Sequence, residues 1–215
     1  MNLGIGLSVL EVAVLFMKKL VMLVSLCITL MLMGCQGKTE SKVFQVLNEH
    51  IKLQNGCNQQ YETLTELFSQ ETVLYNQLMD QGFEDFEQIK PLVEEGSQLV
   101  KEIESQLQDY QTCVDEASLD EKELGAVDSE PLNQLVSTYQ IYEQELEQYT
   151  QSLISLNEAQ QNFYEVSNDQ VSIATLDERI TAINLAIDEA NTHSMKEQEA
   201  LENFNQLYKE YGKMK

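Results

Sequence analysis

The 215-residue sequence contains no tryptophan, two prolines and nine glycines, and it has only 13 Lys and Arg against 36 Asp and Glu. Turns are rich in glycine and proline, so the scarcity of both argues against an all-β or loop-rich fold. The net charge of −23 excludes a general nucleic-acid-binding protein, because neutralising phosphates requires clustered basic side chains. With 43% hydrophobic residues, the chain is still apolar enough to form a packed core.

The first 35 residues predict an export signal. Lys18 and Lys19 form a basic start, residues 20–31 form an apolar run, and the segment ends in Leu32-Met33-Gly34-Cys35. This order is typical of export signals, and the final tetrapeptide resembles a bacterial lipobox. The alternative is an uncleaved membrane anchor with an incidental cysteine. We expect a diacylglycerol thioether on Cys35, no other cofactor, and anchoring to the outer face of the cytoplasmic membrane.

The predicted boundaries follow from this signal. Residues 1–34 form the export signal, residues 35–41 carry the lipidated cysteine and a short tether, and residues 42–215 form the folded domain. Residues 1–16 are apolar but too short to span a membrane. Either translation begins at Met17 or the signal is extended.

Four amphipathic segments follow, over about 41–79, 85–114, 129–166 and 173–211. Apolar residues in the third segment recur at alternating steps of three and four, which is the heptad pattern of packed helices. Its steps are Leu132, Leu135, Tyr139, Tyr142, Leu146, Tyr149, Leu153, Leu156, Gln160 and Phe163. Short connections favour antiparallel neighbours. The sequence therefore predicts an all-α fold, an elongated four-helix up-and-down antiparallel bundle with coiled-coil-like packing.

The ends of these helices are marked by individual residues. Asn55-Gly56 is expected to break the first segment, in which Val43, Val46 and Leu53 are expected to face the core. Gly82 is expected to end that segment, and Pro131 to open the third. Pro91 either kinks the second segment or marks a later start. Thr175 and Glu178 form a capping-box pattern that predicts the start of the fourth.

Two cysteines remain after the signal is removed and Cys35 is lipidated, namely Cys57 and Cys113. If the chain reverses direction at Gly82 between the first two helices, the two cysteines lie roughly 9 Å out of register along the helix axis, too far for a disulfide. A turn centred on residue 85 would bring them level. A disulfide between them is therefore one of two open alternatives.

One group of side chains has the residue types of a metal site. Glu189, His193 and Glu197 are spaced four residues apart and share one side of a helix, so they could hold a divalent cation. The alternative is a polar interruption of the heptad pattern that fixes its register. The tyrosines of the third segment lie at heptad positions, which favours core packing over ligand stacking.

The chain resembles the YkyA-type family of cell-wall-binding lipoproteins of Gram-positive bacteria. The resemblance covers about residues 60–211 and rests on residues 67–83, on 139–149, and on 176–191 with 204–208. Typical stretches are Leu67-Phe68-Ser69-Gln70-Glu71 and Phe204-Asn205-Gln206-Leu207-Tyr208. The resemblance implies a four-helix up-and-down bundle and a role at the cell wall, and it supplies no catalytic residues.

Two functions from different classes are consistent with the sequence. The first is a non-enzymatic, membrane-anchored lipoprotein that contacts peptidoglycan in the cell wall or a protein of the envelope, with no nucleic-acid partner. The second is a carboxylate-rich bundle that binds a divalent metal or acts as an envelope enzyme. The second hypothesis predicts that Glu71, His193 and Glu197 meet in space, with perturbed pKa values.

Overall fold

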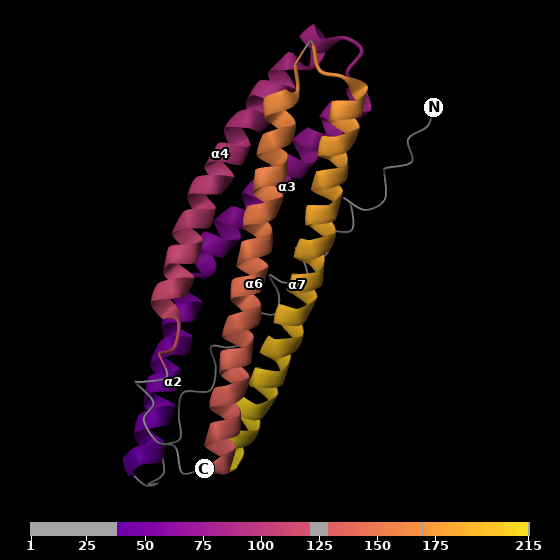
Figure 1. Cartoon of the computed structure of the whole chain (residues 1–215). Helices are drawn as coiled ribbons and strands as arrows, with labels where there is room; N and C mark the ends of the chain where they lie inside the picture. The colour runs from indigo at the N-terminus through magenta and orange to yellow at the C-terminus, as the bar shows by residue number, and fades with distance from the viewer. Residues whose placement is uncertain (1–37, 121–128, 169, 215) are drawn as a thin grey trace.

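The computed structural model describes residues 38–120, 129–168 and 170–214, and in these residues it contains helices and no strand. The helices are α2 (Lys38–Gly56), α3 (Asn58–Gln81), α4 (Phe86–Ala117), α6 (Glu130–Val166) and α7 (Ile173–Met214). Figure 1 shows that α2 and α3 together form one arm of an elongated bundle, and α4, α6 and α7 form the other three. Consecutive arms run antiparallel, so the predicted all-α four-helix architecture is confirmed.

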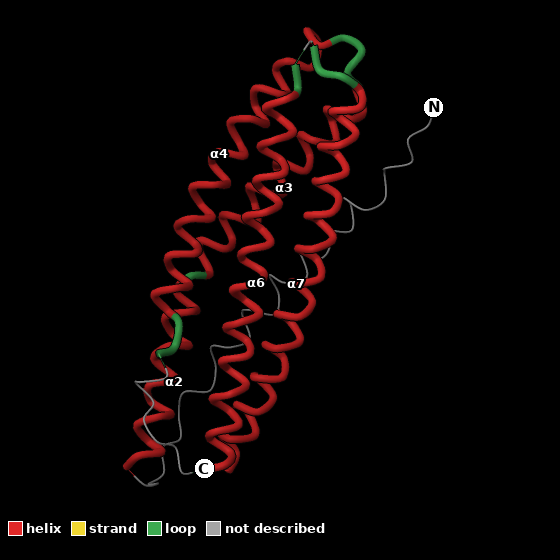
Figure 2. The backbone as a smooth tube through the Cα atoms, viewed as in Figure 1, coloured by secondary structure: helices red, strands yellow, loops and turns green. Residues whose placement is uncertain are grey.

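The bundle is long and narrow, as the smooth trace in Figure 2 shows. Helices α6 and α7 pack along most of their length, and α4 packs against both α3 and α6. At the end of the bundle where α2 begins, α2 also contacts the last turns of α7. The ring of Phe44 stacks on Tyr208 with centroids 5.7 Å apart, and the Tyr208 hydroxyl donates to Asn48 Oδ1 at 2.7 Å. No helix in the described ranges has the length and apolarity needed to cross a bilayer.

The heptad positions predicted for the third segment form the core. Every one of those side chains is buried in α6, including the polar Gln160. The buried tyrosines of α6 confirm the interpretation of its aromatic residues as core packing, since Tyr139 is 1% exposed and Tyr149 2%. Because the same stripe recurs in α3, α4 and α7, one continuous hydrophobic core connects these helices.

The prediction for the core face of α2 was correct for Val43, which is 1% exposed, and wrong for the residues that follow it. Leu53 is 54% exposed and Val46 only partly buried, whereas Leu47 and His50 are buried. Helix α2 packs mainly against α4, and this packing turns His50 toward the end of α4. The burial of His50 is made possible by the carbonyl oxygen of Ala117, which lies 3.1 Å from His50 Nδ1.

Most of the predicted helix ends are confirmed. The first arm is interrupted at Cys57, directly after Asn55-Gly56. Gly82 ends α3 with φ of 73°, a conformation that favours glycine, and its N–H donates to the carbonyl of Leu78. Pro131 lies in the first turn of α6.

The structure corrects three other boundaries. Pro91 lies inside α4, which begins at Phe86, so Pro91 does not mark a later start. The α7 cap is Ser172, not Thr175, because Ser172 Oγ accepts the backbone N–H of Thr175 at 3.1 Å. Helix α2 begins at Lys38, earlier than the expected domain start at residue 42, since no helix-breaking residue follows Gly37.

Candidate functional site

A buried carboxyl group lies in the core of the bundle, in the half that is farther from the start of α2. Glu71 of α3 is 1% exposed, and both of its oxygens face α6. The Nε2 of Gln160 donates to Glu71 Oε2, and the hydroxyl of Tyr164 donates to Glu71 Oε1 at 3.1 Å. Two hydrogen bonds therefore connect α3 to α6 inside the core.

The surroundings of Glu71 favour its neutral form. Burial raises its pKa from 4.5 to about 8, and this outweighs the opposite effect of the hydrogen bonds from Tyr164 and Gln160. The carboxyl therefore carries a proton at neutral pH. Gln160 Oε1 is buried without a partner. Half a rotation of the Gln160 amide would place Oε1 where it can accept that proton.

A glycine on α4 makes this arrangement possible. A Cβ atom built on Gly96 would lie 2.2 Å from Cε1 and 2.3 Å from Cζ of the Tyr164 ring. Only glycine leaves room for the ring to pass α4 and reach Glu71. Gly96, Tyr164 and Glu71 thus connect three helices in one layer of the core.

We expect Gly96→Ala to destabilise the protein by about 2 kcal/mol, because strain from overpacking a core exceeds the gain in helix propensity. Chemical denaturation measures this difference. Gly56→Ala is the matched control, since a Cβ atom there meets nothing within 4 Å. Gly56→Ala should leave stability unchanged or raise it, and equal effects of the two substitutions would contradict the account of Gly96.

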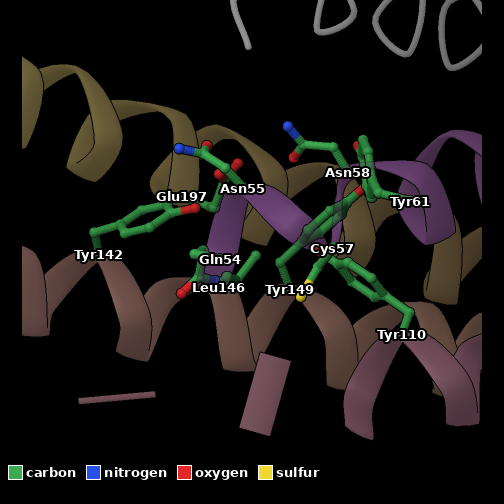
Figure 3. Close-up of a pocket in the computed structure, with 10 residues that line it drawn as sticks. All are labelled: Gln54, Asn55, Cys57, Asn58, Tyr61, Tyr110, Tyr142, Leu146, Tyr149 and Glu197. Carbon is green, nitrogen blue, oxygen red and sulfur yellow. The ribbon is translucent and has the colours of Figure 1, made fainter. Parts of the chain in front are cut away.

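A second polar region surrounds the break between α2 and α3. The cavity there has a volume of about 50 Å³. Figure 3 shows that side chains from α2, α3, α4, α6 and α7 line it, with the hydroxyl of Tyr142 directed toward Glu197. The lining residues are Gln54, Asn55, Cys57, Asn58, Tyr61, Tyr110, Tyr142, Leu146, Tyr149 and Glu197. A space of this size holds water but is far smaller than pockets that hold sugars or cofactors.

The cavity walls are held by covalent and polar contacts. Cys57 and Cys113 form a disulfide with their Cα atoms 5.8 Å apart. The hydroxyls of Tyr61 and Tyr149 lie 3.5 Å apart. Burial raises the pKa of Tyr110, Tyr142 and Tyr149 well above the usual value, so these phenols remain protonated.

A third polar cluster lies where α4 ends. Glu143 of α6 accepts the backbone N–H of Leu119 at 2.8 Å, beside the contact between His50 and the Ala117 carbonyl. Burial raises the pKa of Glu143 to about 7, against the opposite effects of the Leu119 hydrogen bond and of His50. This cluster connects the end of α4 to α2 and α6.

The structure does not gather the predicted metal ligands. Glu189 is exposed, His193 is half-buried and Glu197 is buried. Within the described ranges, no group of three or more His, Cys, Asp or Glu side chains is placed to hold a metal ion. Glu71 also does not meet Glu197. It lies fourteen residues along α3 from Cys57, which lines the cavity with Glu197, and this corresponds to roughly 20 Å.

The predicted export signal and the lipobox, Leu32, Met33, Gly34 and Cys35, lie outside the described residues.

The close approach at Gly96 and the pairing of His50 with Glu143 were not identified from the sequence as features of a site. A glycine at a heptad position of a helix is the one signal that could have indicated the close approach of Tyr164.

Comparison with known proteins identifies one family. The YkyA family, described as "Putative cell-wall binding lipoprotein", matches residues 38–214, which is the whole helical bundle. The family description names no enzymatic activity. No curated protein and no solved structure matches the chain.

Proposed function

The chain belongs to the YkyA family of cell-wall-binding lipoproteins, and from this membership we propose that it is a non-enzymatic lipoprotein of the envelope. Acylated Cys35 anchors it to the outer face of the cytoplasmic membrane, and the helical bundle contacts the cell wall. The observation that carries the proposal is the family match over the entire bundle. The match begins three residues after Cys35, so the membrane anchor and the matched domain are almost adjacent.

The shape of the bundle supports this proposal. Only Gln36 and Gly37 separate Cys35 from the start of α2, so the tether spans less than about 10 Å. Helix α6 contains 37 residues, which corresponds to a length of roughly 55 Å. The short tether keeps one end of this rod at the membrane, and its length allows the other end to reach outward.

The charge of the protein indicates which part of the wall it contacts. With a net charge of −23, the bundle is repelled by anionic lipids and anionic wall polymers unless divalent cations lie between them. We therefore propose contact with the neutral glycan strands of the peptidoglycan, in preference to the anionic polymers of the wall. A protein of the envelope is the alternative partner.

Co-sedimentation of residues 36–215 with purified cell walls tests this proposal. We expect the protein to pellet with peptidoglycan stripped of anionic polymers, in the absence of magnesium. Binding only to intact walls and only with magnesium would instead indicate cation bridging by the acidic surface. If the protein stays in solution under all conditions, wall contact is wrong and an envelope protein becomes the leading partner.

A further inference from the structure

A groove runs between α3 and α4 in the half of the bundle that is farther from the start of α2. It encloses about 570 Å³, within the size range of ligand sites. Its lining comes from both helices and consists of Ser69, Gln70, Val73, Leu74, Gln77, Glu95, Gln98, Leu99 and Glu102. We refer to it as the α3–α4 groove.

The groove combines an apolar centre with polar edges, which consist of amides and carboxylates. Val73 is 54% exposed, although it lies between the two helices, and partly buried Leu99 lies across from it on α4. The exposed amides of Gln70, Gln77 and Gln98 surround this apolar strip. Amides both donate and accept hydrogen bonds. A sugar ring presents an apolar C–H face and a rim of hydroxyls, which this arrangement can match.

The spacing of these side chains suits an extended ligand. Gln70, Val73 and Gln77 lie three and four residues apart, so they form one stripe along α3. Gln70 and Gln77 are separated by seven residues, which is roughly 10 Å along the helix axis. This separation is comparable with the repeat of a β-1,4-linked disaccharide, so both amides can contact successive repeats of one glycan strand.

The charge of the groove disfavours anionic ligands. Its lining contains Glu95 and Glu102 and no lysine or arginine. Carboxylates accept hydrogen bonds from hydroxyls, but they repel phosphates and carboxylates of a ligand. We propose that the α3–α4 groove binds a neutral, β-1,4-linked glycan strand of peptidoglycan; this inference rests on the proposed function and identifies the surface that performs it.

A second groove provides a comparison within the same protein. It lies between α4 and α6, encloses about 300 Å³ and is also rich in glutamine, with Gln111, Gln144, Gln148 and Gln151. Its apolar residue Val114 is only 9% exposed, and Thr150 is 3% exposed. The α4–α6 groove therefore offers amides in a space about half as large as the α3–α4 groove, and it serves as the control surface.

The position of the α3–α4 groove fits contact with the wall. Val73 lies 35 residues after Lys38 along the arm formed by α2 and α3, which corresponds to roughly 50 Å. The groove is thus held well away from the membrane-anchored end of the bundle, on the side where the wall lies.

Binding of the full lipoprotein, extracted from membranes in mild detergent, tests this inference. The probes are stripped peptidoglycan and a soluble oligomer of β-1,4-linked N-acetylglucosamine. We expect Gln70→Ala/Gln77→Ala to weaken binding of both probes roughly tenfold, because two hydrogen bonds are lost. Gln148→Ala/Gln151→Ala in the α4–α6 groove should bind like the wild type. Unchanged thermal melting of both double variants shows that their folds are intact.

The outcomes distinguish a failure of the groove assignment from a failure of the proposed contact with the cell wall. If the wild type binds stripped peptidoglycan and both double variants bind equally well, the groove assignment is overturned while wall contact stands. If the wild type binds neither probe, both are overturned. Retention that survives complete digestion of the glycan strands would indicate a wall-attached protein as the partner, and it would also overturn the glycan assignment.

Discussion

Replacing Glu71 by glutamine should stabilise the protein strongly at alkaline pH and have little effect at acidic pH. In the folded protein the pKa of Glu71 is raised from 4.5 to about 8. The folded state therefore binds more protons than the unfolded state between these values, and stability falls as pH rises through this window. At about 1.4 kcal/mol for each pKa unit, the loss approaches roughly 5 kcal/mol above pH 8.

Chemical denaturation between pH 5 and pH 9 measures this dependence. The wild type should lose stability steadily across the range, whereas Glu71→Gln should lose much less, because the amide keeps a neutral group beside Gln160 and Tyr164. Glu143, whose pKa burial raises to about 7, contributes a residual dependence of the same sign. The matched control is Glu66→Gln on the exposed face of α3. Parallel pH curves for wild type and Glu71→Gln would contradict a neutral Glu71.

Reducing the disulfide is expected to produce the second large effect. Cys57 and Cys113 are separated by 56 residues, and a crosslink over this distance stabilises by about 4 kcal/mol in the chain-entropy estimate. Cys57 also lies at the break between α2 and α3, so the bond holds the junction of these helices against α4. We expect reduction to weaken both global stability and the attachment of α2.

Denaturation and hydrogen exchange, each with and without reductant, check this expectation. The wild type should lose stability on reduction, and amide protection should decrease first in α2, which has fewer contacts with the bundle than the other helices. Cys57→Ala/Cys113→Ala should match the reduced wild type and show no response to reductant. Equal stability of oxidised and reduced wild type would contradict a structural role for the bond.

The regular part of the fold could be predicted from the sequence because it follows from one physical rule. Apolar side chains at alternating steps of three and four can be buried only if the helices pack side by side. This rule correctly places Leu132 through Phe163 in the core of α6. Gly82 and Pro131 mark helix ends because their backbone preferences act locally, so neither depends on the packing of other helices.

The remaining features depend on how one helix is aligned with another, which heptad patterns do not determine. Packing of α2 against α4 buries His50 and leaves Leu53 exposed. The length of the turn after α3 decides whether Cys57 is level with Cys113, and for this reason sequence spacing left the pairing open. The contact between Gly96 and Tyr164 joins α4 to α6. The length of the segment that connects these two helices does not determine how far one is shifted along the other.

The polar groups inside the bundle are best explained as contacts that fix the position of one helix along another. Glu71 and Gln160 lie at core positions of facing helices, and each would be costly to bury without the other. A shift of one helical turn would separate them and would also move Tyr164 away from Gly96. The interior thus specifies the register of the rod, while the exposed α3–α4 groove remains available for contact with the wall.

The salt dependence of binding to stripped peptidoglycan tests the central claim most directly. If the acidic bundle recognises neutral glycan, the amount bound should stay constant or rise slightly between 50 and 200 mM salt, because screening weakens only repulsion. Binding that falls steeply over the same range would mean that attraction between opposite charges drives it. That result, or the absence of binding at every salt concentration, would contradict the account.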